Sequence, residues 1–202
     1  MNAVLRSPAF IVLEGLDGAG KTTCAYKLAR MLDAELMTTP TPAVREYRQQ
    51  ILGSYGRSQE AAQLFYMSTV FAASEAVRAT LAAGRSVVMD RYFLSTQAYA
   101  EFRGSRLALD GIGDLLMPAD LTVYLDVRPE VREQRLLGRG CTAEDRATLC
   151  PETHGRLLDL HRQKASLPVV GRWIEMDNSA PEPGPVTERI LAEIARLGGA
   201  GT

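Results

Sequence analysis

Residues 15–22 read Gly-Leu-Asp-Gly-Ala-Gly-Lys-Thr and follow an apolar run at 9–13. Between a buried strand and a helix, glycines at this spacing let successive backbone N–H groups point at a polyphosphate, and the positive end of the helix adds to the attraction. The Lys21 ammonium can reach the β- and γ-phosphates, and the Thr22 hydroxyl can bind Mg²⁺. The pattern therefore predicts a site for a nucleoside triphosphate. The expected contacts are Gly15, Asp17, Gly18, Ala19, Gly20, Lys21, Thr22 and Thr23.

A second group of polar residues follows the apolar segment at 86–89, where the chain continues Asp90-Arg91-Tyr92. In a parallel sheet, an acid at the carboxyl end of a strand beside a phosphate loop can hold Mg²⁺, directly or through water. The alternative is a salt bridge at the start of the next helix. Behind a phosphate loop, the pair favours phosphoryl transfer, with Asp90 beside Thr22 at the metal.

A polar, glycine-punctuated segment at about 138–151 carries Arg139 and Arg146, and Arg132 and Arg135 precede it. A solvated charged loop is the ordinary interpretation of such a segment. A kinase, however, must exclude water from the transferring phosphoryl group, and a closing loop with arginines can do this while it stabilises transition-state charge. We therefore interpret the segment as a mobile flap, with Arg139 and Arg146 acting on the transferring phosphate.

These motifs need elements to position them, and the chain alternates short apolar runs with helical patterns, which predicts an α/β fold with a mainly parallel sheet. We expect a single domain over 1–197 and a frayed tail at 198–202. Strands are expected at 10–14, 35–38, 86–89, 121–126 and 173–175. Helices are expected at 21–32, 44–53, 59–82, 95–101, 105–116, 129–137, 152–164 and 186–197.

The composition is that of an ordinary globular protein, because 46% of the 202 residues are hydrophobic and 23% are charged. A net charge of −1 gives no global basic field for nucleic acid, and no apolar stretch approaches membrane-spanning length. Three cysteines without metal-like spacing indicate free thiols in a reducing, cytoplasmic setting. His154 and His161 are expected as surface or packing residues of a helix near the flap. We therefore expect a cytoplasmic protein that binds neither nucleic acid nor membranes.

Three segments resemble the thymidylate kinases, which are P-loop kinases of nucleoside monophosphates. Residues 10–23 (FIVLEGLDGAGKTT) are similar to the opening of the family, and 90–99 (DRYFLSTQAY) to its Asp-Arg-Tyr/His segment with the helix behind it. Residues 118–130 (PADLTVYLDVRPE) resemble its strand that runs into the flap helix. Arg139 and Arg146 stand at the positions of the family's flap arginines. The resemblance extends from about residue 9 to about residue 165.

The resemblance implies a P-loop fold, a three-layer sandwich with a five-stranded parallel sheet, usually in a homodimer. It implies transfer of the γ-phosphoryl group of ATP to dTMP, with Mg²⁺ as cofactor. Asp17 would lie at the acceptor's sugar or in the magnesium shell, and Arg91 would bridge the donor and acceptor phosphates. Phe65 would stack on the base, and Tyr99 would press on the sugar. The residues implied to face the base are Thr96 and Gln97.

The sequence departs from this family on the acceptor side. After the second strand the family has an arginine beside a proline for the acceptor phosphate, whereas here Pro40 is kept and Arg45 is the next basic residue. Four residues after Phe65, where the family reads the pyrimidine with an arginine, stands Thr69. Two charge-assisted contacts, each worth about 1.5–3 kcal/mol, are thereby absent. The cations that could replace them are Arg45, Arg48 and Arg103.

Three functions follow from these observations. The first is a nucleoside monophosphate kinase with dTMP as the leading acceptor. The second is a kinase of the same fold with another acceptor, such as another nucleotide, a nucleoside, or a small phosphate or phosphonate. The threonines at positions 38, 39, 41 and 69 would suit a less anionic or hydroxyl-rich acceptor. The third is a nucleotide-dependent switch or binding module without phosphotransfer. The chain has no Asn-Lys-x-Asp guanine motif and keeps Lys21, Asp90 and Arg91, which argues against this third reading.

Overall fold

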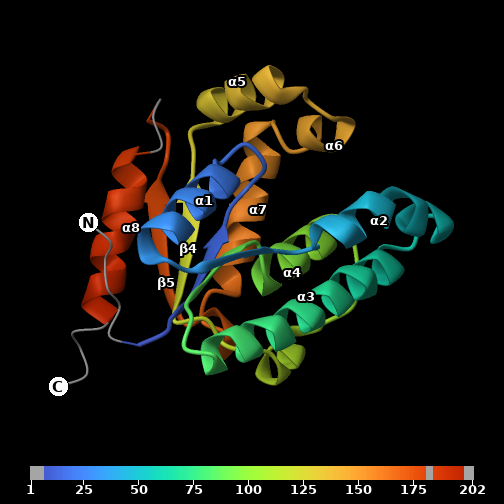
Figure 1. The fold of residues 1–202 in the computed structure, drawn as a ribbon. Coiled ribbons are helices and arrows are strands. Elements are labelled where there is room, and N and C mark those ends of the chain that lie inside the picture. Colours follow the sequence, from blue (N-terminus) through green and yellow to red (C-terminus); the bar gives the residue numbers. More distant parts are fainter. Residues whose placement is uncertain (1–6, 181–183, 198–202) are drawn as a thin grey trace.

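The protein is described by a computed structural model that covers residues 7–180 and 184–197 (Figure 1). Five strands form one parallel sheet in the order β2-β3-β1-β4-β5, with helices packed on both of its faces. The predicted three-layer α/β fold is thereby confirmed. The tail expected at 198–202 lies outside the described residues. The strands are β1 (Phe10–Glu14), β2 (Glu35–Thr38), β3 (Val87–Asp90), β4 (Leu121–Asp126) and β5 (Arg172–Asp177).

Three strands have their predicted bounds, and β3 and β5 differ at the ends. β3 begins and ends one residue later than predicted, so that Asp90 pairs with Leu13 of β1 and with Thr38 of β2. β5 extends beyond the predicted 173–175 on both sides, because its backbone pairs with β4 from end to end. The exposed polar residues of this edge strand concealed that pairing in the sequence. The parallel register brings the ends of β1, β2 and β3 to the same edge of the sheet.

Helices α1 (Lys21–Leu32) and α3 (Gln59–Ala82) have their predicted bounds. The helix expected at 105–116 is wrong, because only a short 3₁₀ helix, η1 (Asp110–Leu115), forms there. Two glycines, Gly111 and Gly113, fall inside this segment, and each costs the interior of an α-helix about 1 kcal/mol. The other elements are α2 (Pro42–Ser54), α4 (Phe93–Phe102), α5 (Pro129–Arg139), α6 (Ala143–Arg146), α7 (Pro151–Gln163), η2 (Pro168–Val170) and α8 (Gly184–Leu197).

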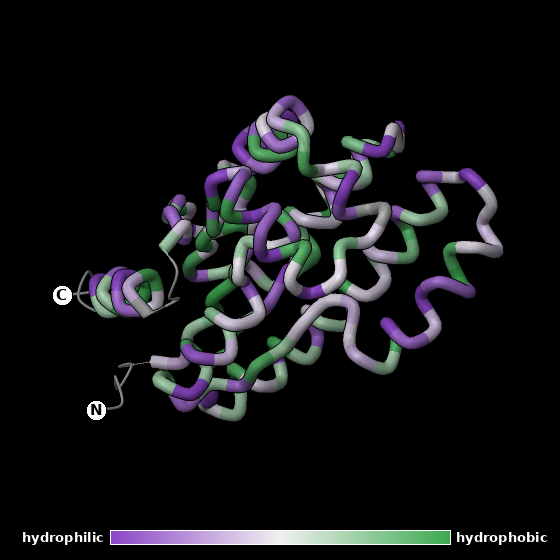
Figure 2. The backbone as a smooth tube through the Cα atoms, turned by 90° about the horizontal axis from the view of Figure 1, so that it is seen from above, coloured by the Kyte–Doolittle hydropathy of each residue, from purple (hydrophilic) through white to green (hydrophobic). Residues whose placement is uncertain are grey.

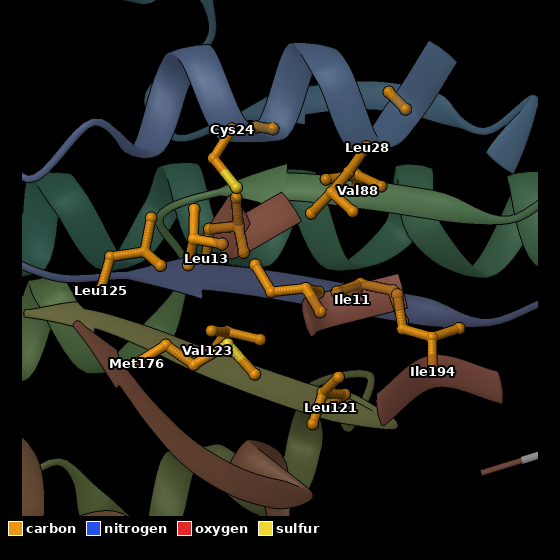
Figure 3. Packing of buried hydrophobic residues seen from close by; sticks show 14 of the residues in the cluster. Ile11, Leu13, Cys24, Leu28, Val88, Leu121, Val123, Leu125, Met176 and Ile194 are labelled. Carbon is orange, nitrogen blue, oxygen red and sulfur yellow. The ribbon is translucent and has the colours of Figure 1, made fainter. Parts of the chain in front are cut away.

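Two apolar clusters cover the two faces of the sheet. On one face, α1 and α8 pack against alternate strand residues, and Figure 3 shows Cys24 and Leu28 directed from α1 toward the sheet. On the other face, α3 and α4 contribute Met67, Val70 and Phe93 to a second cluster. Every side chain of β1 is buried, which is what a central parallel strand requires. The loop that follows β1 therefore starts from a fixed base.

Helices α2 and α3 project together to one side of the sheet, which Figure 1 shows clearly. α2 buries none of its residues. In Figure 2 hydrophilic segments are frequent along this projecting pair, whereas hydrophobic ones gather nearer the middle of the molecule. The pair forms one side of the cavity described below. Within residues 7–180 and 184–197, no helix has the length and apolar character to cross a membrane.

The predicted flap at 138–151 contains more regular structure than an open loop. α5 runs on to Arg139, the short helix α6 follows, and α7 begins at Pro151. Figure 1 places α5 and α6 together at one end of the molecule, beyond the start of α7. The mobility of this segment stays a prediction.

Candidate nucleotide-binding and phosphoryl-transfer site

A cavity of about 680 Å³ lies where β1, β2 and β3 end. Its walls come from the phosphate loop (residues 15–22), the ends of β2 and β3, helices α2, α3 and α4, and the flap helix α5. Crevices at the carboxyl ends of parallel strands are the usual ligand sites of such sheets. Thr22, which is far in the sequence from the neighbours Asp90 and Arg91, lines this cavity together with them.

The glycines of the phosphate loop have a positive φ, which strains any other residue. Gly15 has φ +137°, and a Cβ atom there would lie 2.5 Å from the carbonyl oxygen of Leu125. Gly20 has φ +85°, and a Cβ atom there would lie 2.7 Å from Nδ2 of Asn178. Because α1 begins at Lys21, directly after this turn, the positive end of the helix lies at the loop. These glycines therefore allow the tight turn that places the loop backbone at the start of α1.

The Lys21 side chain lies at the floor of the cavity and is only partly neutralised. It is 5% exposed, and its Nζ atom donates to the carbonyl oxygen of Leu16 over 2.7 Å. Burial, together with the nearby charge of Arg91, lowers the pKa of Lys21 to about 8, although Asp17 and Asp90 act in the opposite direction. An ammonium group has three donors, so anionic oxygens in the cavity can still bind it.

Thr22 and Asp90 form a pair that fits Mg²⁺. The Thr22 hydroxyl donates to Oδ2 of Asp90 over 2.5 Å. The other carboxylate oxygen, Oδ1, is buried and has no hydrogen-bond partner among the described residues. Mg²⁺ is usually held by one or two carboxylates together with substrate phosphates, rather than by an all-protein cage. Accordingly, no cluster of three or more His, Cys, Asp or Glu side chains in the described ranges is arranged to hold a metal alone.

Arg91 occupies a strained position between the phosphate loop and α4. Its φ of +69° lies in the left-handed region, which costs a residue other than glycine about 1–3 kcal/mol. Its guanidinium donates to the Gly15 carbonyl over 3.2 Å, to the Ser95 hydroxyl over 2.9 Å and to Oδ1 of Asp17 over 2.5 Å. Burial alone would raise the pKa of Asp17, but the charges of Arg91 and Lys21 outweigh it and hold that pKa well below its usual range. Arg91 is thus fixed at the edge of the cavity, with Asp17 ionised beside it.

Glu14, which sequence analysis did not single out, helps to hold Arg91 in place through hydrogen bonds to Ser95. It is fully buried, and its Oε1 accepts from the backbone N–H groups of Tyr92 (3.0 Å) and Ser95 (3.3 Å) at the start of α4. Its Oε2 accepts from the Ser95 hydroxyl, which in turn accepts from Arg91. Burial raises the pKa of Glu14, against the lowering by Ser95 and Arg91. The sequence feature that could have identified Glu14 is the position of an acidic residue at the end of an apolar strand.

Three guanidinium groups line the other end of the cavity: those of Arg45 and Arg48 on α2 and that of Arg103 at the end of α4. Arg45 donates only to neutral oxygens, Oγ1 of Thr38 (2.9 Å) and the carbonyl of Pro40 (3.3 Å). Among the described residues, none of these arginines pairs with a carboxylate. This end of the cavity therefore has unpaired positive charge.

Side chains from α3 and α4 make the remaining wall of the cavity. Only some of the residues predicted to contact the acceptor are among them. Thr69, Thr96 and Tyr99 line the cavity, as does the retained Pro40. Phe65 does not line it, whereas its neighbour Tyr66 does. Helical spacing puts Phe65 and Tyr66 within one turn of Thr69, so periodicity alone could not separate them.

Gln97 is buried behind the cavity wall rather than in it. Its Oε1 accepts from Nε2 of Gln63 over 2.9 Å, and the Ser105 hydroxyl donates to Oε1 of Gln63 over 2.5 Å. Gln63 is the member of this group that lines the cavity. Gln97 therefore holds Gln63 in place, a relation between distant residues that no sequence pattern signalled.

Of the two flap arginines, Arg139 lines the cavity and Arg146 does not, whereas Arg135, which precedes the flap, also lines it. Arg146 is exposed and donates to the carbonyl of Cys141 over 3.1 Å. Arg139 donates to Oδ1 of Asp145 over 3.0 Å. Arg135 bonds the carbonyl of Asn178 over 2.9 Å, while its buried Nη1 has no hydrogen-bond partner among the described residues. Asn178 also lines the cavity, and its position after β5 gave no signal in the sequence.

A glycine loop between β1 and α1, a parallel five-stranded sheet and a cavity over their junction define a P-loop nucleotide-binding protein. The model of the thymidylate kinase family matches residues 13–170. A thymidylate kinase of Halorhodospira halophila is 35% identical over 216 positions, which cover 93% of this chain and 94% of that protein. One of Ruegeria pomeroyi is 32% identical over 206 positions, which cover 93% and 96%. The chain belongs to the thymidylate kinase family.

The solved structures agree with this fold. A thymidylate kinase of Candida albicans superposes with a TM-score of 0.71 at 20% sequence identity, covering 95% of this chain and 94% of the other. A thymidylate kinase of Ehrlichia chaffeensis superposes with a TM-score of 0.63 at the same identity. The predicted resemblance and fold class are therefore confirmed.

Proposed function

We propose that the protein transfers the γ-phosphoryl group of ATP to dTMP in the presence of Mg²⁺. The observation that carries this proposal is one cavity that is lined by the phosphate loop with Lys21, by Arg91, and by Arg45, Arg48 and Arg103. The Lys21 end has the backbone shape for a triphosphate. The opposite end, with Arg45, Arg48 and Arg103, has the charge for a second phosphate. The named relatives support the choice of dTMP.

The chemistry would rest on positioning and charge rather than on proton transfer, because a phosphate acceptor is already anionic at neutral pH. The loop amides and Lys21 would hold the β- and γ-phosphates. The Thr22 and Asp90 pair would hold Mg²⁺, which when bound neutralises charge on those phosphates. Arg91, anchored by Gly15 and Asp17, would keep the donor and acceptor phosphates together in line.

The flap would complete the site by excluding water. Arg139 is the flap arginine whose guanidinium lies at the cavity, so we assign it the role that sequence analysis gave jointly to Arg139 and Arg146. We propose that residues 1–197 act as one kinase domain with the flap at 138–151. Within the family resemblance we further propose a homodimer. The free thiols of Cys24, Cys141 and Cys150 fit a cytoplasmic protein.

An anionic acceptor is favoured over an uncharged one. The threonines at positions 38, 39, 41 and 69 suggested a hydroxyl-rich partner, but in the structure the hydroxyl of each already donates or accepts a hydrogen bond; that of Thr41 accepts from the Val44 N–H over 3.5 Å. Thr39 donates to the carbonyl of Arg91 over 2.9 Å, Thr69 donates to that of Tyr66 over 2.7 Å, and Thr38 accepts from Arg45. The guanidinium groups of Arg45, Arg48 and Arg103 have no carboxylate partner among the described residues, and their charge matches a phosphate.

The direct test is an acceptor panel with chromatographic detection of products. Purified protein is incubated with ATP, Mg²⁺ and one of dTMP, dUMP, CMP, UMP or thymidine, and parallel samples contain a chelator. We expect saturable, magnesium-dependent formation of dTDP with one ADP released for each, and no product from thymidine. Folded protein that phosphorylates none of the monophosphates, or that prefers thymidine, would refute the proposal.

A further inference from the structure

Arg132 is the largest fully buried side chain of the described residues, and its charge has no carboxylate partner among them. A guanidinium taken out of water costs several kcal/mol unless polar groups surround it. Here those groups are neutral: two backbone carbonyls, one hydroxyl and one imidazole nitrogen. A leucine or methionine would fill the same space at lower cost. The arginine therefore has a reason to be there beyond packing.

The partners of Arg132 lie on three separate parts of the site. Its Nε atom donates to the carbonyl of Asp17 in the phosphate loop over 2.7 Å. Its Nη1 atom donates to the carbonyl of Thr148 over 2.7 Å, and Nη2 donates to the Thr148 hydroxyl. The phosphate loop also packs closely here, since a Cβ atom at Gly18 would lie 3.0 Å from Cγ of Arg132. One guanidinium thus joins the phosphate loop to the segment that follows α6.

The third partner fixes Arg132 to the body of the domain. Nη1 of Arg132 lies 3.3 Å from Nδ1 of His154, and Nε2 of His154 lies 3.3 Å from Oδ1 of Asp126 at the end of β4. Because a guanidinium only donates, Nδ1 must accept, and the imidazole carries its proton on Nε2, where it donates to Asp126. His154 is buried, so of its two predicted roles it has the packing one. His154 thus connects Arg132 to Asp126 at the end of β4, and Thr148 connects Arg132 to the flap.

From Thr148 the contacts continue to the cavity. The Thr148 backbone N–H and hydroxyl both donate to the carbonyl of Asp145, over 3.0 and 2.9 Å. The carboxylate of Asp145 accepts from Arg139 and from the backbone N–H and hydroxyl of Thr142. Arg139 is the flap residue at the cavity. An unbroken series of hydrogen bonds therefore leads from the loop carbonyl of Asp17 to the Arg139 guanidinium.

We propose that Arg132 is a positioning residue that latches the flap onto the phosphate loop through Thr148, so that Arg139 faces the transferring phosphate only while the latch is closed. This inference rests on the proposed function for its catalytic consequence. In this proposal, the exclusion of water depends on the buried contact between Arg132 and Thr148, which lies outside the cavity. Loss of the latch should slow transfer and let water compete as acceptor, so that ATP is consumed without product.

The test uses Thr148→Val, because removal of Arg132 itself leaves a large buried space that can unfold the protein. Valine keeps the branched shape but loses the hydroxyl that Nη2 of Arg132 needs. Thr148→Ser is the matched control, since it keeps that hydroxyl. Three readouts are compared at equal Mg–ATP: kcat with dTMP, the number of ATP molecules consumed per dTDP formed, and hydrogen exchange of residues 140–150 with a non-hydrolysable ATP analogue.

For Thr148→Val we expect kcat about tenfold lower, the affinity for ATP unchanged within about twofold, and more than one ATP consumed per dTDP. We also expect ATP-analogue protection of 140–150 in the wild type and in Thr148→Ser, but not in Thr148→Val. The inference is overturned if both variants match the wild type, if both fail equally, or if valine lowers kcat while the ATP ratio and the exchange stay unchanged. If the wild type forms no dTDP, the proposed function fails, and the exchange measurement still decides on the latch.

Discussion

The two ends of the cavity are built from different parts of the polypeptide. The donor end combines backbone, namely the glycine loop and the start of α1, with the side chains of Thr22 and Asp90, which are hydrogen-bonded to each other. The acceptor end is made of long side chains, Arg45, Arg48 and Arg103, that have no acidic partner among the described residues. Donor recognition is thus fixed before the ligand arrives, whereas acceptor recognition is completed by the ligand's own charge.

The largest expected effect comes from the donor end. Lys21→Ala removes the ammonium group proposed to contact the phosphates, and we expect kcat to fall about a thousandfold with the fold intact. Lys27→Ala, on the same helix but away from the cavity, is the matched control and should behave as the wild type. The measurement is steady-state dTDP formation, with thermal unfolding to confirm folding. Near-normal turnover of Lys21→Ala would contradict the role proposed for Lys21 at the donor end of the cavity.

Arg91 lies between the two ends, and its removal should affect chemistry more than binding. For Arg91→Ala we expect kcat about a hundredfold lower and the dissociation constant for Mg–ATP changed by less than about threefold. The control is Arg85→Ala, just before the start of β3 and so at the opposite end of this strand from Arg91, where the arginine forms an exposed ion pair with Glu35. Single-turnover rates and calorimetry measure the two quantities. The reverse pattern would make Arg91 a residue of ATP binding alone.

The acceptor end should respond separately from the donor end. For Arg45→Ala or Arg103→Ala we expect the KM for dTMP to rise about tenfold, because each loses one charge-assisted contact, while the KM for ATP stays constant. Arg57→Ala serves as control, since Arg57 is exposed and does not line the cavity. If these variants changed the KM for ATP as strongly as that for dTMP, the two ends would not be independent.

The smallest effect concerns pH, and only the donor end should show it. Lys21 has a pKa lowered to about 8, so it loses its proton as the pH rises through that value, and phosphates that prefer the ammonium then bind less well. We expect the Mg–ATP affinity to fall several-fold between about pH 7.5 and about pH 9, with proton uptake on binding. Guanidinium groups do not titrate in this range, so the KM for dTMP should stay level.

Calorimetry in two buffers of different ionisation enthalpy measures the proton uptake, and Lys21→Ala is the control that should abolish it. A pH dependence that survives this substitution would assign the titration to another group.

The same contrast explains what the sequence could predict. The strands, α1 and the phosphate loop were predictable because glycine spacing and apolar runs encode backbone shape locally. The helix expected at 105–116 was wrong, because Gly111 and Gly113 weaken an α-helix there and only the short η1 forms. β5 was predicted too short, since its polar residues conceal pairing that its neighbour β4 imposes.

Side-chain contacts between distant elements were the other limit. The choice between Phe65 and Tyr66 depends on how α3 rotates against α4, and the support of Gln63 by Gln97 joins two helices. Glu14 could have been noticed as an acid at the end of an apolar strand, but its partners at 92 and 95 could not. The positions of charged residues in the sequence do not show which of their side chains line the same cavity.

The account depends most on the phosphate loop as a site for a triphosphate. The most direct measurement is calorimetric titration of folded wild-type protein and of Lys21→Ala with ATP, with and without Mg²⁺. We predict saturable binding of ATP to the wild type, strengthened by Mg²⁺, and binding at least about tenfold weaker in Lys21→Ala. Absence of binding to folded wild-type protein, or equal affinity of the two proteins, would contradict it.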